Sequence, residues 1–323
     1  MMKKTLVALA AVAAASGAFA QATLTGAVGV GYSSTISTAN ALASGMGVDD
    51  ASANFATTED IEGFGKLAAN FGVYAGASGE ASSGNDMAIS ITSASGVSFK
   101  VDSSKGASYL TNGVASVGTA YQWGLDGKLF TARTRNETAS IKIPVAESLA
   151  LTLSHTEGSN ATTGYGVGAG AAGTTAQRYN TGALKYSAGA LVVDAQYRTY
   201  DSQTTSSSTT SASRTRGAAS YDLGVAKIGA GFEQTIYTYG NKLTDTLVGV
   251  NVPAGALNLG AQIASRSASD NSSSSSNYDR AGYLLVANYA ISKRTYVVAN
   301  YYTYDGGSTT NGSGYGLFLY NSF

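Results

Sequence analysis

Apolar and polar side chains alternate along much of the chain. From residue 22 to residue 32, the even positions carry the larger apolar groups, among them Leu24, Val28 and Tyr32, and the odd positions carry only Thr, Ala and Gly. A β-strand points successive side chains to opposite faces. This segment therefore predicts a strand with one apolar face and one face of small or polar groups.

Charged residues join the same alternation further along the chain. Leu191, Val193 and Tyr197 alternate with Asp194 and Arg198. The segments 225–237 and 257–266 repeat the arrangement. Charges at every second position are costly in a packed core, but they suit a wall that has lipid on one side and water on the other. The pattern favours a membrane-embedded barrel over a soluble one with a filled interior.

The connections between these segments also alternate in length. Short turns are predicted at 61–63, 94–96, 144–146, 187–189, 223–224, 253–255 and 292–294. Long stretches rich in Ser, Thr, Gly and Asn, interpreted as solvated loops, lie at 35–51, 158–177, 201–213 and 267–277. Short turns on one rim and long loops on the other are typical of outer-membrane barrels, with the turns periplasmic and the loops extracellular.

The alternating segments number sixteen. They start near residues 22, 52, 64, 86, 97, 133, 148, 178, 190, 215, 225, 244, 256, 279, 295 and 313. We therefore expect an all-β fold, a sixteen-stranded antiparallel transmembrane β-barrel. A barrel of this size is too wide for side chains to fill, so an aqueous channel is expected to remain.

One long connection, residues 104–132, differs from the others. It is less rich in serine and contains large apolar groups such as Tyr109, Leu110 and Phe130. We expect this third loop to fold into the lumen as a constriction; the alternative is an ordinary external loop. Its charged residues are Lys105, Asp126 and Lys128, a net charge of 2 − 1 = +1.

The first residues have the pattern of a secretory signal peptide. Lys3 and Lys4 precede an apolar run over 5–15, and Ala18, Phe19 and Ala20 supply small residues at a cleavage site. We expect residues 1–20 to be the signal peptide and residues 21–323 to be the barrel. The mature chain contains no apolar run of about 18 residues, so it would cross a membrane only as a closed barrel.

Composition and charge narrow the function further. The chain has no cysteine, and its 20 basic and 20 acidic side chains cancel. This balance argues against a nucleic-acid partner. An outer-membrane hydrolase would need a histidine base, but the single histidine, His155, has outward parity. We expect no enzyme, no cofactor and no metal site, and we interpret Asp49 and Asp50 as a solvated acidic pair in the first long loop.

Four segments resemble the Gram-negative trimeric porin family, especially its β-proteobacterial branch. They are Tyr289–Thr295 (YAISKRT), Glu59–Ala68 (EDIEGFGKLA), Ser220–Lys227 (SYDLGVAK) and the final strand, where Tyr315, Leu317 and Leu319 precede Phe323. The resemblance implies sixteen strands, a homotrimer, an inward third loop and passive diffusion of ions and small solutes. It also implies that the final strand is an assembly signal for the barrel assembly machinery.

The chain departs from the family pattern at its end, which reads FLYNSF, and in the third loop, which lacks an acidic cluster. Both departures leave the charge preference of the channel open. The runner-up function is a non-conducting outer-membrane barrel that acts as an adhesin or a structural protein.

Ion selectivity is expected to depend on charges that point into the lumen. The candidates with inward parity are the basic Lys142, Arg198, Lys227, Arg266 and Arg280 and the acidic Asp194 and Glu233. This set leans weakly towards anions, unless the arginines pair with acids or lie in wide parts of the lumen. Arg133 and Arg135 share parity with outward residues, so they lie above the lipid band or follow a bulge; the sequence leaves this open.

Overall fold

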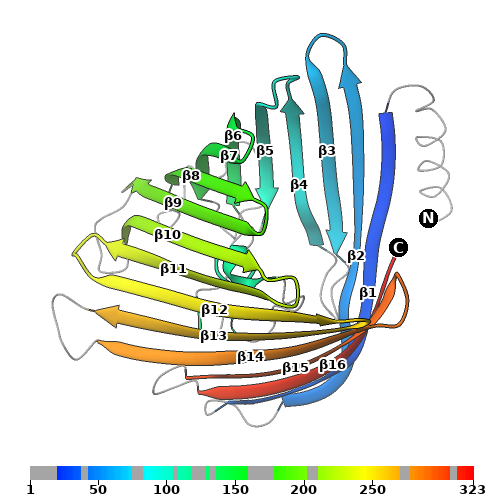
Figure 1. The fold of residues 1–323 in the computed structure, drawn as a ribbon, viewed down its shortest axis with the longest axis vertical. Coiled ribbons are helices and arrows are strands. Elements are labelled where there is room, and N and C mark those ends of the chain that lie inside the picture. The colour runs from blue at the N-terminus through cyan, green and yellow to red at the C-terminus, as the bar shows by residue number, and fades with distance from the viewer. Residues whose placement is uncertain are drawn as a thin grey trace.

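The chain forms a closed antiparallel barrel of sixteen strands (Figure 1), as predicted. The computed structural model describes residues 20–37, 43–74, 83–104, 108–117, 125, 129–130, 136–158, 178–201, 210–269, 277–305 and 311–323. Each strand pairs with its neighbours in the sequence, and β1 pairs with β16. The ring therefore has no free edge, and every strand has a hydrogen-bonding partner on both sides.

The strands are β1 (Ala20–Ser37), β2 (Ala43–Ile61), β3 (Gly65–Tyr74), β4 (Ser83–Thr92), β5 (Ser98–Ser104), β6 (Asn136–Ala146), β7 (Leu149–Gly158), β8 (Arg178–Ala188), β9 (Leu191–Asp201), β10 (Ser211–Asp222), β11 (Lys227–Tyr237), β12 (Lys242–Ala254), β13 (Leu257–Ser269), β14 (Tyr278–Ala290), β15 (Thr295–Tyr304) and β16 (Gly312–Ser322). One short 3-10 helix, η1 (Val114–Ser116), lies between β5 and β6. Within the described residues, no helix is long and apolar enough to span a bilayer.

The two ends of the barrel meet through backbone hydrogen bonds. The amide of Gly26 donates to the carbonyl of Phe323 at 3.0 Å, and the amide of Phe323 donates to the carbonyl of Gly26 at 3.0 Å. The Phe323 ring fills the space beside Gly26, where a Cβ would lie 2.5 Å from it. A glycine is required here because any side chain would displace that ring.

The alternation in the sequence corresponds to the two faces of the wall. Along β16, Tyr315, Leu317 and Leu319 are 50%, 55% and 44% exposed, whereas Phe318 and Tyr320 are 6% and 5% exposed. The outer face is therefore a continuous apolar surface. The inner face carries polar groups and the residues that contact the third loop.

The short turns all lie on one rim. Gly63, Gly96, Gly189, Gly224 and Gly255 have positive φ there, a conformation that glycine adopts without steric cost. Two of the turns begin later than predicted, because β6 continues past Pro144 to Ala146 and β12 continues past Pro253 to Ala254.

The predicted first long loop, 35–51, is wrong. β1 continues to Ser37 and β2 begins at Ala43, with Thr35 paired to Ala43. Ser, Thr, Gly and Ala suit a strand whose inner face meets water, so composition does not distinguish such a strand from a loop. Asp49 and Asp50 consequently lie in β2, at a bulge opposite Gly29 and Val30, and not in a solvated loop.

The third loop folds inside the barrel, as predicted. Its described residues are 108–117, 125 and 129–130, and η1 lies within the ring of strands (Figure 1). Leu110, Ala115, Leu125, Leu129 and Phe130 are all buried. The apolar side chains that distinguish this loop in the sequence therefore attach it to the inner wall.

Candidate functional site

The third loop rests on glycines of the barrel wall. A Cβ built on Gly229 would lie 2.6 Å from the Ala115 oxygen, and one on Gly249 would lie 2.8 Å from the same atom. A Cβ on Gly231 would lie 2.9 Å from the Ala115 Cβ. Real Cβ atoms do not approach backbone atoms this closely, so η1 can occupy its place only because these three positions lack side chains. We call Gly229, Gly231 and Gly249 the glycine seat.

The second half of the loop packs on apolar inner-wall residues. Leu125 and Leu129 are 1% and 0% exposed. They belong to a buried cluster that includes the inward Leu247, Leu284 and Val298 of β12, β14 and β15. Burying such side chains stabilises the docked loop by about 1.5–3 kcal/mol each. The loop is thus fixed against the wall formed by β9–β15.

Tyr109 ties the beginning of the loop to β9. Its hydroxyl donates a hydrogen bond of 3.0 Å to the carbonyl oxygen of Asp194. Burial and the neighbouring Asp194 carboxylate raise the pKa of Tyr109. The phenol therefore stays protonated and keeps donating this bond over the whole physiological pH range.

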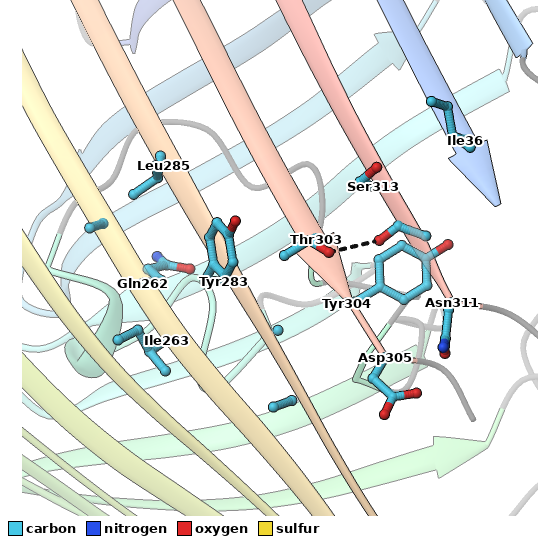
Figure 2. Close-up of a pocket in the computed structure, with 14 residues that line it drawn as sticks. Ile36, Gln262, Ile263, Tyr283, Leu285, Thr303, Tyr304, Asp305, Asn311 and Ser313 are labelled. Atoms are coloured by element: carbon cyan, nitrogen blue, oxygen red, sulfur yellow. Dashed lines mark hydrogen bonds between the residues drawn. The ribbon is translucent and has the colours of Figure 1, made fainter. Parts of the chain in front are cut away.

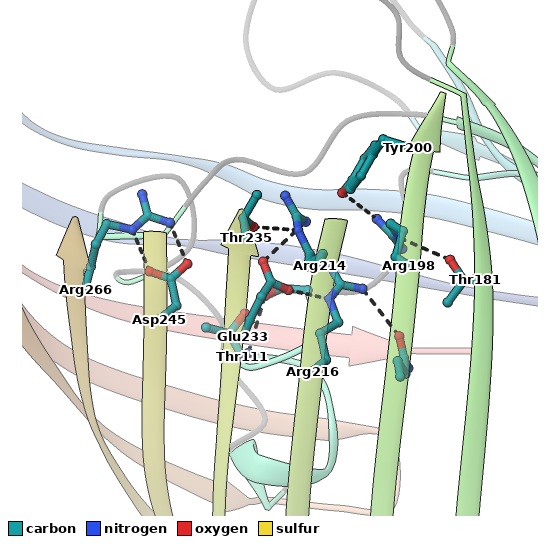
Figure 3. Close-up of polar contacts among 12 residues, drawn as sticks. Thr111, Thr181, Arg198, Tyr200, Arg214, Arg216, Glu233, Thr235, Asp245 and Arg266 are labelled. Carbon is teal, nitrogen blue, oxygen red and sulfur yellow. Dashed lines mark hydrogen bonds and ion pairs between the residues drawn. The ribbon is translucent and has the colours of Figure 1, made fainter. Parts of the chain in front are cut away.

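A continuous charged belt crosses the inner wall next to the glycine seat, on its long-loop side. Arg216, Glu233, Asp245, Arg266 and Arg280 are successive cross-strand partners from β10 to β14. One row further towards the long-loop rim, Arg198 faces Arg214. We call these seven residues the charged belt, and Figure 3 labels all of them except Arg280.

Ion pairs neutralise part of the belt. Arg266 holds both oxygens of Asp245, with hydrogen bonds of 2.6 and 2.7 Å. Glu233 pairs with Arg216 at 2.5 Å and with Arg214 at 3.3 Å. Thr111 of the third loop lies beside Glu233 (Figure 3), so the belt and the loop meet at this point.

Two belt arginines have no carboxylate partner among the described residues. Arg198 donates to the hydroxyls of Thr181 at 3.1 Å and Tyr200 at 3.4 Å, and its guanidinium lies 3.8 Å from the centre of the Tyr179 ring. The Arg280 guanidinium lies 3.9 Å from the centre of the Tyr278 ring. Neutral hydroxyls and rings position these cations without cancelling their charge. The belt carries five arginines and two acids, a net charge of 5 − 2 = +3.

The opposite wall is more acidic. Asp49 accepts a hydrogen bond from the hydroxyl of Tyr320, and Asp50 lies on the same inner face, paired with Gly29. On β5, Lys100 and Asp102 form an ion pair of 3.1 Å. A solute in the lumen therefore has a mainly basic wall on one side and a more acidic wall on the other.

The other candidate residues fall into two groups. Lys142 alternates with outward Ile141 and thus faces inward, and Asp194 and Lys227 line an inner cavity beside the third loop. Lys105, Asp126, Lys128, Arg133 and Arg135 lie outside the described residues.

Sequence reasoning missed several inward charges, chiefly Arg214, Arg216 and Asp245. Arg214 falls between the loop predicted at 201–213 and the tenth strand, which is expected to start near 215, and Arg216, at the start of that strand, is not among the predicted candidates. They continue the inward parity of Ala218 and Ser220. Extending that alternation towards the N-terminus by four residues would have found them.

His155 lies on the outer face. Its Nδ1 is 2.8 Å from Asn180 Oδ1 and its Nε2 is 3.3 Å from Glu157 Oε1, and it borders a surface hollow with Phe99 and Leu153. Among the described residues, no nucleophilic side chain is hydrogen-bonded to His155. Nor do the described parts of the chain contain a group of three or more His, Cys, Asp and Glu side chains suited to a metal ion.

A larger hollow of about 910 Å³ lies on the outer wall between β13 and β1 (Figure 2). It is lined largely by apolar groups such as Ile263, Tyr283 and Leu285, and a hydrogen bond of 3.2 Å from Thr303 to the carbonyl of Gly312 crosses it. Ile263 is 69% exposed. This hollow belongs to the apolar outer surface and is separate from the charged lumen.

Comparison with known proteins agrees with this geometry. The model of the Gram-negative porin family matches residues 6–309. No curated protein matches the chain in sequence.

Three solved structures illustrate the similarity in fold. OmpT of Vibrio cholerae, in a trimer form, is 12% identical, covers 95% of this chain and 100% of its own, and has a TM-score of 0.69. The anion-selective porin of Comamonas acidovorans is 14% identical over 94% of this chain and 100% of its own, with a TM-score of 0.63. A triple mutant of the Rhodopseudomonas blastica porin is 11% identical over 94% and 100%, with a TM-score of 0.62. The chain therefore belongs to the Gram-negative porin family, and it forms a channel of the outer membrane.

Proposed function

We propose that this porin is a general diffusion channel with a weak preference for anions. The observation that carries the proposal is the charged belt, which presents a net charge of 5 − 2 = +3 beside the third loop. Charges fixed in a narrow, low-dielectric wall act on passing ions more strongly than charges on an open surface. Lys142, Lys185 and Lys227 add further positive charge to the inner wall.

The preference for anions is weak because acidic side chains and screening by salt oppose it. Asp245 and Glu233 each hold arginines of the belt, and Asp49, Asp50 and Asp102 lie on the facing wall. Screening also limits each charge to about 8 Å at physiological salt. The Comamonas acidovorans porin, which is described as anion-selective and shares the fold, supports the same sign.

The test is the current through the purified protein in a planar lipid bilayer under a salt gradient. We expect stepwise ohmic currents and a reversal potential of the sign that anion flow produces. A reversal potential of the opposite sign would show that the acidic wall dominates. Silence from correctly folded protein would instead favour the non-conducting alternative, an adhesin or structural barrel.

Export and assembly complete the proposal. Residues 1–20 act as a cleaved signal peptide, which their charged, apolar and small-residue order supports. The mature chain forms a homotrimer, as the trimer form of the Vibrio cholerae neighbour suggests. The final strand, with Tyr315, Leu317, Leu319 and Phe323 on its outer face, is the segment read by the barrel assembly machinery.

We also propose that the protein has no enzymatic activity and carries no cofactor. His155, the single histidine, faces outward, and its ring nitrogens lie within hydrogen-bond distance of Asn180 and Glu157. Outer-membrane hydrolysis by a histidine base needs a nucleophile or water placed against that histidine. Assays of the purified protein with ester and peptide substrates test this directly, and turnover that disappears in His155→Ala would overturn it.

A further inference from the structure

Two of the short turns carry clusters of like charge. The turn between β2 and β3 contains or adjoins Glu59, Asp60 and Glu62, and the turn between β14 and β15 contains Lys293 and Arg294. The residues that connect the strands in the other five short turns include a single charged side chain. The two clusters therefore distinguish these turns from the rest of the rim.

Part of the acidic cluster is neutralised within the chain. The Lys66 ammonium lies 3.8 Å from the Asp60 carboxylate, so this acid already has a partner. Glu59 and Glu62 are exposed and form no ion pair with another described residue. We call Glu59 and Glu62 the acidic turn, because they are the negative charges that remain for another molecule.

Lys293 and Arg294 form the basic turn. Both are exposed, and neither forms an ion pair within the described part of the chain. The backbone beneath them is well fixed: the amides of Arg294 and Thr295 donate to the hydroxyl of Ser292 at 3.2 and 3.0 Å, and the amide of Ser322 donates to the Arg294 carbonyl at 2.8 Å. The turn thus presents two cations from a rigid base.

The two turns flank the seam between β1 and β16 symmetrically. β1 and β2 separate the seam from the acidic turn, and β15 and β16 separate it from the basic turn. In a ring of identical subunits around the membrane normal, each copy uses two different sides of one patch, and every residue keeps its height. Both turns lie on the same rim, so a ring whose axis faces the seam brings the acidic turn of one copy to the basic turn of the next.

The charges face outward, where a neighbour would lie. Glu59 shares its strand face with Phe55, whose ring stacks on Phe71 at 4.9 Å, and Phe71 is 53% exposed on the outer wall. Ile291, beside the basic turn, is 57% exposed. A carboxylate on the outer wall of a barrel is costly near lipid, and an opposite charge placed against it lowers this cost.

We propose that the acidic turn of one subunit docks on the basic turn of the next, so that the partner of each turn is another copy of this chain. The inference rests on the proposed homotrimer and names a contact within it. Exposed ion pairs contribute little each, whereas like charges brought together are costly. The contact therefore determines mainly which sides of the subunits meet.

Cross-linking tests the contact directly, because the chain contains no cysteine. The protein with Glu62→Cys and Lys293→Cys in one chain is treated in detergent with a short bismaleimide and separated on a denaturing gel. We expect covalent dimers and trimers. Each substitution alone should leave monomers, since the contact joins two different residues. The matched control is Glu147→Cys with Lys293→Cys, which should also leave monomers, because Glu147 lies in the β6–β7 turn of the same rim, far from the seam.

Charge reversal tests the role of the charges. Glu59→Lys with Glu62→Lys, or Lys293→Glu with Arg294→Glu, places like charges at every contact. We expect the trimer of either variant to dissociate in detergent about tenfold faster than the unaltered trimer. A chain with all four substitutions again joins opposite charges and should dissociate at the rate of the unaltered protein. Glu147→Lys is the control and should not change this rate.

Sedimentation of the unaltered protein in detergent separates the two proposals. A monomer would overturn the homotrimer and this contact with it. A trimer that does not cross-link between positions 62 and 293, or that cross-links through Glu62→Cys alone, would overturn the contact and leave the homotrimer standing. So would fast dissociation of the chain with all four reversals.

Discussion

Asp245 and Arg266 face each other across β12 and β13 and are joined by two parallel hydrogen bonds of 2.6 and 2.7 Å. Both are buried on the inner face of the wall, at 4% and 8% exposure. The Arg266 guanidinium also lies 5.9 Å from the centre of the Phe130 ring. The pair thus links the charged belt to the loop. A substitution in this pair is therefore expected to change both the charge of the lumen and the stability of the barrel.

Replacing one partner of this pair should destabilise the barrel. Asp245→Asn leaves Arg266 buried without its counter-ion, a change that costs about 3–5 kcal/mol for buried pairs. We expect the temperature at which the folded barrel unfolds in detergent to fall. The shift is read from the loss of the compact, heat-sensitive band on gel electrophoresis.

The matched control is Asp60→Asn, which breaks an ion pair with Lys66 at the rim. That pair is exposed and screened, and we expect no measurable change in unfolding temperature. Equal changes in unfolding temperature for Asp60→Asn and Asp245→Asn would show that the burial of Asp245 does not affect the stability of the barrel.

Arg198 should contribute more to selectivity than the paired arginines. Arg198 faces the lumen and forms no ion pair with a carboxylate among the described residues. Arg198→Gln therefore removes a positive charge that no neighbouring acid compensates. One unit charge at 8 Å in water is worth about 0.5 kcal/mol, which screening at physiological salt reduces to about 0.2 kcal/mol. Because this energy has opposite signs for anions and cations, the anion-to-cation ratio changes by a factor of about two. We expect the reversal potential to move towards cations by that factor. The double variant Asp245→Asn with Arg266→Gln removes no net charge, and its reversal potential should equal that of the unaltered protein.

The glycine seat should control conductance. Gly229→Ala places a Cβ 2.6 Å from the Ala115 oxygen, and backbone cannot yield as a flexible side chain does. We expect η1 to leave the wall and the single-channel current to change, with larger open-channel noise. Gly47→Ala is the control: Gly47 lies between outward Met46 and Val48 and has nothing within 4 Å of its Cβ position. Identical single-channel currents in both variants would contradict the role of the glycine seat in positioning η1.

Phe323 should matter for closing the ring. Its backbone pairs with Gly26, and its ring covers that glycine. We expect Phe323→Ala to lower the yield of folded barrel when purified, denatured protein is refolded in detergent. Leu319→Ala, on the same outer face at 44% exposure, should refold better. Normal refolding of Phe323→Ala, together with poor assembly in cells, would mean that recognition by the assembly machinery is its sole role.

Much of the fold could be predicted because the alternation is local. Strand starts near 178, 190 and 295 agree with Arg178, Leu191 and Thr295 to within one residue. A lipid-facing strand must be apolar at every second position, so a short stretch of sequence is enough to reveal it. The apolar groups of the third loop predicted its inward course for the same reason, since they need a surface to bury against.

The rest depends on which strands become neighbours at which register. The start of β2 was missed by nine residues, 52 against Ala43, because its upper part is built from small polar groups. Pairing of Glu233 with Arg214 and Arg216 joins residues of two strands, and no single-strand pattern reveals it. The candidate list therefore contained inward charges, but it could not show which of them cancel.

The η1 segment of the third loop is positioned by missing atoms, whereas the second half of the loop is held by the buried side chains of Leu125, Leu129 and Phe130. Gly229, Gly231 and Gly249 have no side chains, and this leaves room for the backbone of η1. Side chains of the loop that point away from the wall consequently do not contribute to holding the loop in place. The bore of the channel and its chemical preference are thus determined by separate sets of positions, and an engineer could exchange the second set while leaving the first untouched.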